Sequence, residues 1–186
     1  GSSTETLTGG RRYTYICPVE SNLRIIRPSR EEVYDATAGT WKTEKTYTKY
    51  DKLGNLLEIK DNNGVYTTFL WGYQGLYPVA KVTGSTLAEV STAINLSNIE
   101  SNPIAGSMSF YENKLRTLSV AGKDVTTYYY LPFVGLLNIN TPDGKVINYI
   151  YNSDGKLKRI EDNEGKSVEG VYYSPDNKQW LEVIVP

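Results

Sequence analysis

Short apolar runs separated by glycine-containing turns form the clearest pattern in the chain. The segment 149–173 reads YIYNSDGKLKRIEDNEGKSVEGVYY, with turn sequences DG at 154–155 and DNEG at 162–165. The runs between these turns are rich in Tyr, Val, Ile and Leu. Runs of this composition, joined by short turns that contain Gly, predict consecutive antiparallel β-hairpins.

The same pattern occurs earlier, where residues 49–69 read KYDKLGNLLEIKDNNGVYTTF. The two segments align without a gap, which indicates an internal repeat. Identical residues occupy matched positions: Tyr50 and Tyr151, Gly54 and Gly155, Leu56 and Leu157, Ile59 and Ile160, Asp61 and Asp162, and Gly64 and Gly165. In both copies the Leu and the Ile have an odd spacing, whereas strict alternation gives even spacings on one face. This shared irregularity predicts a β-bulge at the same place in both copies.

Further strands are predicted on both sides of the first copy and around the second. The predicted strands are 12–17, 23–26, 41–50, 55–60, 65–73, 77–82, 126–131, 136–140, 145–151, 156–161, 166–173 and 179–185. The segment 29–39 is ambiguous between a helical turn and a loop. Because the connections after residue 124 are short, neighbouring strands should pair antiparallel and form a meander.

In the middle of the chain the spacing of apolar residues changes from a strand pattern to a helical pattern. Thr86 and Glu89 form a capping-box sequence, which marks the start of a helix. The apolar residues beside it share one helical face: Leu87, Val90 and Ile94. A second capping box is predicted at 109–112, with its own apolar face: Tyr111, Leu115 and Leu118. The sequence therefore predicts a helical pair at roughly 86–96 and 109–119.

These patterns together predict a mainly β fold. An antiparallel meander of hairpins is expected to form an extended twisted sheet, with a short helical pair inserted near the middle. Residues 1–10 are small and polar, which predicts a disordered tail. Residues 11–186 are predicted to be a single domain with the helical insertion at about 85–120, a length that can bury a proper core.

Composition narrows the function classes. The chain has 20 basic and 21 acidic residues and a formal net charge of −1, which argues against a nucleic-acid-binding surface. No apolar run approaches the roughly 20 residues that cross a bilayer, and the opening GSSTETLTGG lacks the features of a leader. Cys17, the single cysteine, is expected to be either a buried small residue or a free thiol. Histidine is absent, which removes the usual proton carrier near neutral pH.

Aromatic usage is uneven. The chain contains 16 Tyr but 3 Phe and 3 Trp. Tyr suits half-buried strands, because its ring packs while its hydroxyl stays wet. This usage predicts thin sheets with a large exposed face, and such a face could also stack on sugars.

The order of tyrosine, glycine turn, Leu-x-x-Ile and Asp-x-x-Gly resembles the YD repeat. Residues 50–56, YDKLGNL, match its YD-x-x-G-x-L core, whereas 151–157, YNSDGKL, depart from it at Asn152. Three further stretches look like the same family: 70–82, 86–90 and 128–145. Over roughly residues 45–175 the chain therefore resembles the YD-repeat, or Rhs-type, β-repeat proteins of bacterial surfaces.

The resemblance implies long, spiralling antiparallel sheets. In large family members such a sheet closes into a shell around a C-terminal toxin. This chain has room for only a few hairpins and stops at Val185-Pro186, directly after a predicted strand. The resemblance thus implies a C-terminal fragment or a short relative without a toxin, located at the cell surface or secreted.

Five aromatic residues are candidates for stacking on a ligand: Trp41, Trp71, Tyr73, Tyr77 and Trp180. Aromatic side chains can form a platform for sugar rings, and these five would be its members. The alternative is that they pack the sheet or cover the helical pair, as aromatic residues at strand positions usually do.

Several carboxylates could suggest a glycosidase pair: Glu58, Asp61, Glu161, Asp162 and Glu164. Asp61 and Asp162, however, stand at turn positions, where Asp is favoured because it hydrogen-bonds nearby backbone. The spacing in DNNG and DNEG is too short for a calcium loop of the EF-hand type. The sequence contains no phosphate-binding loop or serine elbow, so no cofactor or metal is expected.

The leading expectation is a non-catalytic structural or binding module of a bacterial surface or secreted Rhs-like protein. Its partners would be other parts of a larger repeat protein, or a surface glycan or protein, and not nucleic acid. Exposed aromatic faces or an unpaired strand edge would make the contact. A carbohydrate-binding module is the alternative, and a glycoside hydrolase is a third hypothesis.

Overall fold

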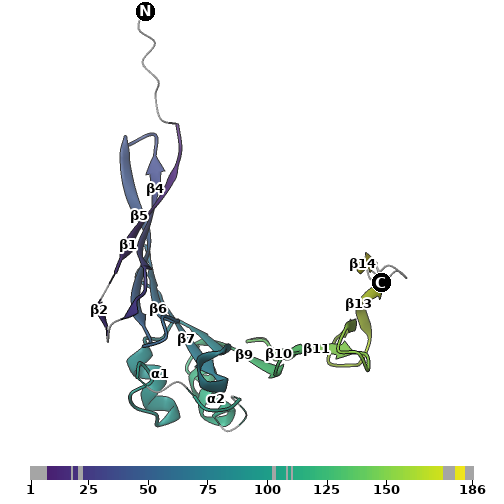
Figure 1. Cartoon of the computed structure of the whole chain (residues 1–186). Helices are drawn as coiled ribbons and strands as arrows, with labels where there is room; N and C mark the ends of the chain where they lie inside the picture. Colours follow the sequence, from purple (N-terminus) through teal and green to yellow (C-terminus); the bar gives the residue numbers. More distant parts are fainter. Residues whose placement is uncertain are drawn as a thin grey trace, which may run out of the picture.

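A computed structural model shows the chain as one long antiparallel sheet with a pair of helices near its middle (Figure 1). It describes residues 8–17, 19–20, 23–101, 104–107, 109, 111–173 and 179–182. Side chains are described for these residues except 19–20, 23–24, 120, 169–173 and 179–182. Residues 1–7 of the predicted tail lie outside the described part, so the predicted domain boundaries stay predictions.

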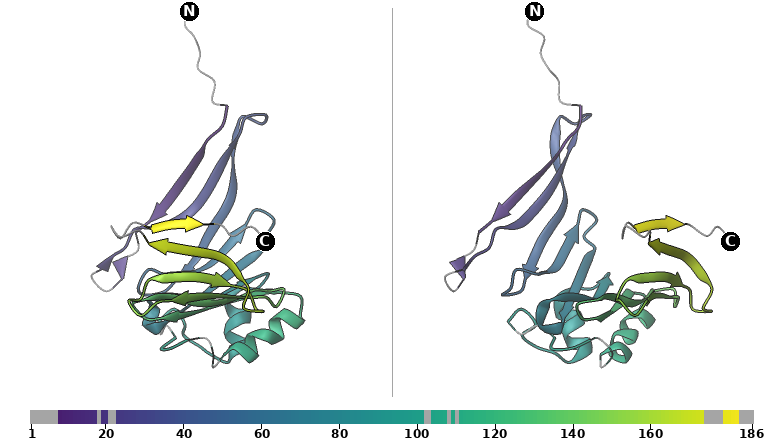
Figure 2. Two further views of the ribbon diagram at one scale, coloured as in Figure 1. Left: turned by 90° about the vertical axis from the view of Figure 1, so that its right-hand side faces the viewer. Right: turned by 45° about the vertical axis from the view of Figure 1, so that its right-hand side comes forward.

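The main sheet has 12 strands, and their order in space follows their order in the chain. The strands are β1 (Arg11–Ile16), β4 (Arg27–Asp35), β5 (Thr40–Tyr50), β6 (Leu56–Asp61), β7 (Tyr66–Gly72), β8 (Tyr77–Thr83), β9 (Asp124–Leu131), β10 (Gly135–Asn140), β11 (Val146–Tyr151), β12 (Leu157–Glu161), β13 (Ser167–Tyr173) and β14 (Gln179–Glu182). A separate two-stranded sheet, β2 (Val19–Glu20) with β3 (Leu23–Arg24), lies in the β1–β4 connection. All pairs are antiparallel, which confirms the predicted meander. The strip does not close, and the right-hand view of Figure 2 shows its first and last strands on separate arms.

The helices α1 (Leu87–Ile94) and α2 (Glu112–Val120) connect β8 to β9, and the short 3-10 turn η1 (Tyr73–Gly75) connects β7 to β8. The first capping box is confirmed, because the Thr86 side chain accepts from the Glu89 N–H while the Glu89 carboxylate accepts from the Thr86 N–H. Glu58 of β6 accepts from the Leu87 N–H at 2.7 Å, which attaches the start of α1 to the sheet.

The core lies where the helices cover the middle of the strip. Its apolar residues come from β6 to β9, the two helices and the segments around them: Leu57, Leu70, Val79, Ala80, Val82, Leu87, Val90, Ile94, Ile99, Ile104, Leu115 and Val125. All six residues of β1 are exposed, and the residues of β10, β11 and β12 are half-buried or exposed. Only the centre of the described sheet is therefore packed on one face in the manner of a globular domain.

Four turns are built alike. The Oδ1 atom of their first residue accepts two backbone N–H groups, from two and four residues further on, at distances between 2.8 and 3.0 Å. These first residues are Asp51, Asp61, Asn152 and Asp162. Asn152 preserves the geometry because an amide oxygen accepts as a carboxylate oxygen does. The glycine at the fourth position has a positive φ in each turn, which other residues adopt at a cost.

The predicted bulge is present in both repeat copies. Leu57 and Lys158 occupy the same repeat position, and each is the extra residue opposite the preceding strand. The bulge explains the odd Leu-to-Ile spacing, because one unpaired residue reverses the alternation of faces.

The tyrosine that opens each copy binds a carbonyl beside another bulge. The Tyr50 hydroxyl donates to Pro28 O at 2.5 Å, and the Tyr151 hydroxyl donates to Leu136 O at 2.8 Å. Pro28 and Leu136 each directly precede a register shift in their own strand. Desolvation by burial raises the pKa of Tyr50 to about 12.

The segment 29–39 forms neither the helical turn nor the loop that were predicted. It contains most of strand β4 and the turn 36–39. The strand lacks an apolar alternation because its buried positions include Glu31 and Glu32, which are held by arginines of β1. Cross-strand ion pairing at β4 takes the place of the apolar signal on which the prediction relied.

One smaller prediction is also wrong, and the structure decides between the two alternatives for Cys17. The second capping box does not form, because α2 has Tyr111 as its N-cap residue without a side-chain cap bond. The Ser109 hydroxyl lies 2.9 Å from the Ser107 hydroxyl, and Glu112 interacts with the sheet. Cys17 is exposed, so it is a free thiol and not a buried residue.

Candidate functional site

Three tyrosines form a cluster where η1 meets β8 and β9. The rings of Tyr77 and Tyr130 stack with centroids 4.7 Å apart, and the Tyr73 ring meets both edge-on. The Tyr73 hydroxyl also donates to Tyr130 O at 3.0 Å. Burial raises the pKa of Tyr130 to about 12. This tyrosine cluster brings together two of the predicted stacking residues, Tyr73 and Tyr77, and adds Tyr130.

The tryptophans do not join this cluster. The Trp71 indole N–H donates to Leu56 O at 2.8 Å, and its ring packs against the core. Trp41 is the second residue of β5, and its ring contacts the Tyr34 ring. The Cζ atom of Arg12 lies 4.5 Å from the centroid of the Trp41 ring. The Trp180 side chain lies outside the described part of the chain. Among the described rings, the predicted residues therefore do not form one platform.

An exposed apolar surface adjoins the tyrosine cluster. Phe133, in the β9–β10 turn, is 92% exposed, and Leu76 is 64% exposed. The Phe133 N–H donates to the Tyr77 hydroxyl at 3.3 Å. Tyr73, Gln74 and Phe133 all have positive φ, a conformation that is unfavourable for residues other than Gly. The sequence stretch LPFVG contained Phe133, but periodicity could not show that its side chain faces solvent.

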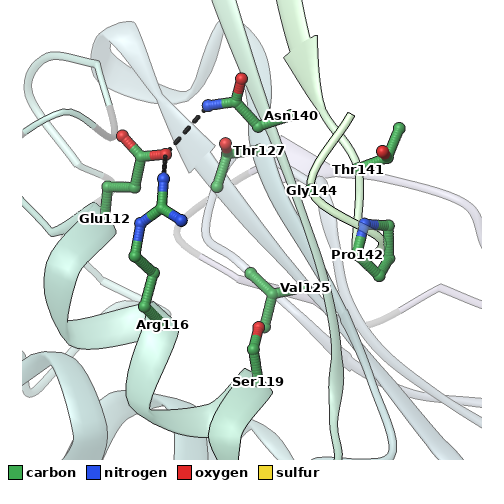
Figure 3. A pocket seen from close by; sticks show the side chains of 9 residues that line it. All are labelled: Glu112, Arg116, Ser119, Val125, Thr127, Asn140, Thr141, Pro142 and Gly144. Carbon is green, nitrogen blue, oxygen red and sulfur yellow. Dashed lines mark hydrogen bonds and ion pairs between the residues drawn. The ribbon is translucent and has the colours of Figure 1, made fainter. Parts of the chain in front are cut away.

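A pocket of about 280 Å³ lies between α2, β9, β10 and the turn 141–144 (Figure 3). Glu112 dominates its polar wall, because its carboxylate accepts from Arg116 at 3.0 Å, Asn140 at 2.9 Å and the Tyr129 hydroxyl at 2.5 Å. Burial, and then the bond to Glu112, holds the pKa of Tyr129 above its ordinary value. With three donors bound, the carboxylate serves mainly to attach α2 to the sheet.

A group of charged side chains lies between the edge strand β1 and its neighbour β4. Arg11 pairs with Glu31, and Arg12 pairs with Glu32 at 2.8 Å. The side chains of Glu31 and Glu32 are only 3% and 8% exposed. The bond from Arg12 holds the pKa of Glu32 below its ordinary value. Because buried carboxylates need partners, these arginines help to hold β1 on β4.

Four of the five carboxylates that could suggest a glycosidase pair have structural partners. Asp61 and Asp162 bind their own turns, Glu58 binds Thr48 and the start of α1, and Glu161 pairs with Arg159. The part of the chain that the structure describes contains no group of three or more His, Cys, Asp or Glu side chains able to hold a metal ion. Neither of its helices combines the length and the apolar composition that crossing a membrane requires.

No family model matches the chain, and no curated protein matches it either. The open, bulged antiparallel meander is nevertheless similar in fold to parts of solved structures. The crystal structures of TcdB2-TccC3-Cdc42 and of TcdB2-TccC3 without its hypervariable C-terminal region each match with a TM-score of 0.51 and 13% identity. A Photorhabdus luminescens Tc holotoxin pore matches at a TM-score of 0.47 and 12% identity, which is too low to carry an argument.

These matches concern the fold alone. Each alignment covers 94% of this chain but 8% of the solved chain. The chain therefore has the architecture of a small section of those proteins.

Proposed function

We propose that the chain is a non-catalytic structural module, one section of a larger Rhs-like β-sheet protein. The observation that supports this proposal most directly is that several strands of the sheet are not buried on either face. No residue of β1, β10, β11 or β12 is fully buried, whereas a sheet in a globular domain buries at least one face. A module whose faces and edges join neighbouring sections would show this exposure when considered by itself.

The distribution of exposed apolar side chains supports this proposal. Ile26 is 70% exposed, and Leu76 and Phe133 are exposed to a similar or greater degree. Groups of large exposed apolar residues mark surfaces that contact other proteins. Like the free β1 edge, they are suited to contact with further parts of a repeat protein.

The proposal places this larger protein at the bacterial cell surface or outside the cell. The YD-type sequence pattern, which resembles repeat proteins of bacterial surfaces, supports this location. No chemical reaction is assigned to the chain, and four of the five candidate carboxylates, Glu58, Asp61, Glu161 and Asp162, are bound within the fold.

Cross-linking within the complete protein tests the structural role. A photoreactive residue at position 133 should link to strand-forming segments outside residues 1–186. The same residue at position 63, in a polar turn that is also exposed, serves as the control. Equal yields from both positions, or links confined to this chain, would contradict the proposal.

Carbohydrate binding is a second candidate, and the tyrosine cluster is the observation that favours it. Tyr77 and Tyr130 use one face of each ring on the other, which leaves only their outer faces for a sugar. A glycan array with the unaltered chain and the Tyr77→Ala chain would test this candidate. Binding that disappears in the variant supports it, and absence of binding by the unaltered chain rejects it.

A further inference from the structure

Among the strands that the structure describes, β1 has a neighbour on only one of its two backbone edges. It stands first in the strand order, and all six of its residues are exposed. The Ser29 hydroxyl of β4 donates to Thr14 O at 3.1 Å, so Thr14 turns its backbone groups toward β4. Because successive residues of a strand direct these groups to opposite sides, Tyr13 presents its N–H and C=O at the open edge. Such an edge is a template for a further strand.

The charge beside this edge is unbalanced. Glu31 is shared by two cations, and Glu32 is also shared by two. The four cations are Arg11, Lys45, Arg12 and Arg30. The whole chain has a formal net charge of −1, so the excess of positive charge is local to β1 and its neighbours.

The sign of charge alternates from strand to strand, going inward from the edge. Arg11 of β1 pairs with Glu31 of β4, and Lys45 of β5 lies 3.4 Å from the same Glu31. Asp61 of β6 is the register partner of Lys45. Opposite charges on neighbouring strands stabilise a sheet, and continuing the alternation outward places an acidic residue beside β1.

Arg11 and Arg12 of β1 can donate hydrogen bonds to further partners. Their side chains are 54% and 51% exposed, although each already contacts a glutamate. A guanidinium has five N–H donors, and Arg12 uses its Nε for Glu32. Since Arg11 and Arg12 are consecutive in a strand, their side chains leave on opposite faces of the sheet. A partner strand that meets both would carry acidic residues at two consecutive positions.

We propose that the β1 edge accepts a further β-strand with two consecutive acidic residues, one directed to each face, beside Arg11 and Arg12. The inference rests on the proposed structural role and specifies the kind of strand that joins this edge. A second copy of β1 is a poor occupant, because pairing two such edges would bring together the positive excess of both.

A peptide with the sequence of residues 28–35, PSREEVYD, is a suitable probe. It contains consecutive acidic residues, and within the chain its residues belong to β4, which pairs with β1 from the other side. The fluorescent peptide should bind the complete chain, and a peptide with both glutamates replaced by glutamine should bind at least about tenfold more weakly, equivalent to about 1.4 kcal/mol. Added salt should weaken binding of the acidic peptide more than that of its control.

The Tyr13→Pro variant tests whether the peptide binds at the open edge of β1. Proline removes one outward N–H and is tolerated at strand edges, so the variant should remain folded by circular dichroism and bind the acidic peptide at least about tenfold more weakly. Arg12→Gln is a second variant, expected to reduce the preference for the acidic peptide over its glutamine control.

Three results would overturn the inference. These are equal binding of the two peptides, unchanged binding to a folded Tyr13→Pro chain, and self-association through β1 without peptide binding. Equal binding would leave the structural role intact, because the edge could still accept another kind of strand. Conversely, failure of the cross-linking test with retained peptide preference would reject the larger-protein role and keep the edge specificity.

Discussion

At the scale of single residues, the repeat tyrosines use both parts of their side chain. The ring lies partly buried in the sheet, and in Tyr50 and Tyr151 the hydroxyl binds a carbonyl beside a bulge. Phenylalanine could supply the ring but would leave that carbonyl without this donor. This requirement accounts for part of the preference for Tyr over Phe in the chain.

Alkaline pH should destabilise the chain through the hydroxyls of Tyr50 and Tyr130. The pKa values of Tyr50 and Tyr130 are raised to about 12, mainly by burial, whereas an unfolded tyrosine has a pKa of about 10. The folded state therefore retains these protons more tightly. Its stabilisation is complete below pH about 10 and is lost as pH rises through about 12.

Urea unfolding across this pH range, combined with tyrosinate absorbance, would measure the effect. The Tyr50→Phe chain should lose stability less steeply with pH than the unaltered chain. Tyrosines that all ionise near pH 10 in the folded chain would refute the expectation.

Gly72 is expected to be intolerant of a side chain. A Cβ atom there would lie 2.4 Å from Gly106 O and 2.6 Å from a methyl group of Val79. Gly72→Ala should therefore lower the free energy of unfolding by about 2 kcal/mol. Gly106→Ala is the matched control, because its Cβ would have nothing within 4 Å. If both variants had similar urea midpoints, the α1–α2 loop would have moved to make room for the new side chain, and the prediction for Gly72 would be wrong.

At the scale of elements, Glu112 connects α2 to two strands. Glu112→Gln keeps the size of the side chain but removes the charge that binds Arg116, Asn140 and Tyr129. Hydrogen bonds to charged groups contribute about 1.5–3 kcal/mol, so we expect a loss of about 2 kcal/mol in thermal or urea unfolding.

Glu100→Gln is the matched control for this exchange. Its ion pair with Lys49 is largely exposed, and exposed pairs contribute less than about 1 kcal/mol. If the two variants lost the same stability, the assigned role of Glu112 would be wrong.

Local sequence signals predicted those elements whose stability is local. The α1 capping box, the glycine turns and the repeated bulge each depend on residues close in the chain, and all three are present. β4 was missed because the burial of Glu31 and Glu32 depends largely on cations of two other strands, β1 and β5. For the same reason the tyrosine cluster was predicted only in part, since Tyr130 joins Tyr73 through the β8–β9 pairing.

At the scale of the whole molecule, stability should be graded along the strip. The buried core involves β6 to β9 and the helices, whereas β1 and β10 to β12 bury little. Hydrogen exchange followed by mass spectrometry should show slow exchange in β6 to β8 and α1, and faster exchange in β1 and β10 to β12. Uniform protection of all strands would indicate that the chain unfolds as one cooperative unit.

The simple strand order has a consequence for how such a chain can change in length. Each strand of the main sheet pairs with the strands that come before and after it in that sheet. Adding or deleting a whole hairpin would therefore alter the strand pairing at one place in the sheet and leave all other strand pairs in register. The energetics are those of a linear array, in which each unit and each contact with its neighbour contributes separately. The helix-covered centre then acts as an anchor from which relatives of different length could extend in either direction.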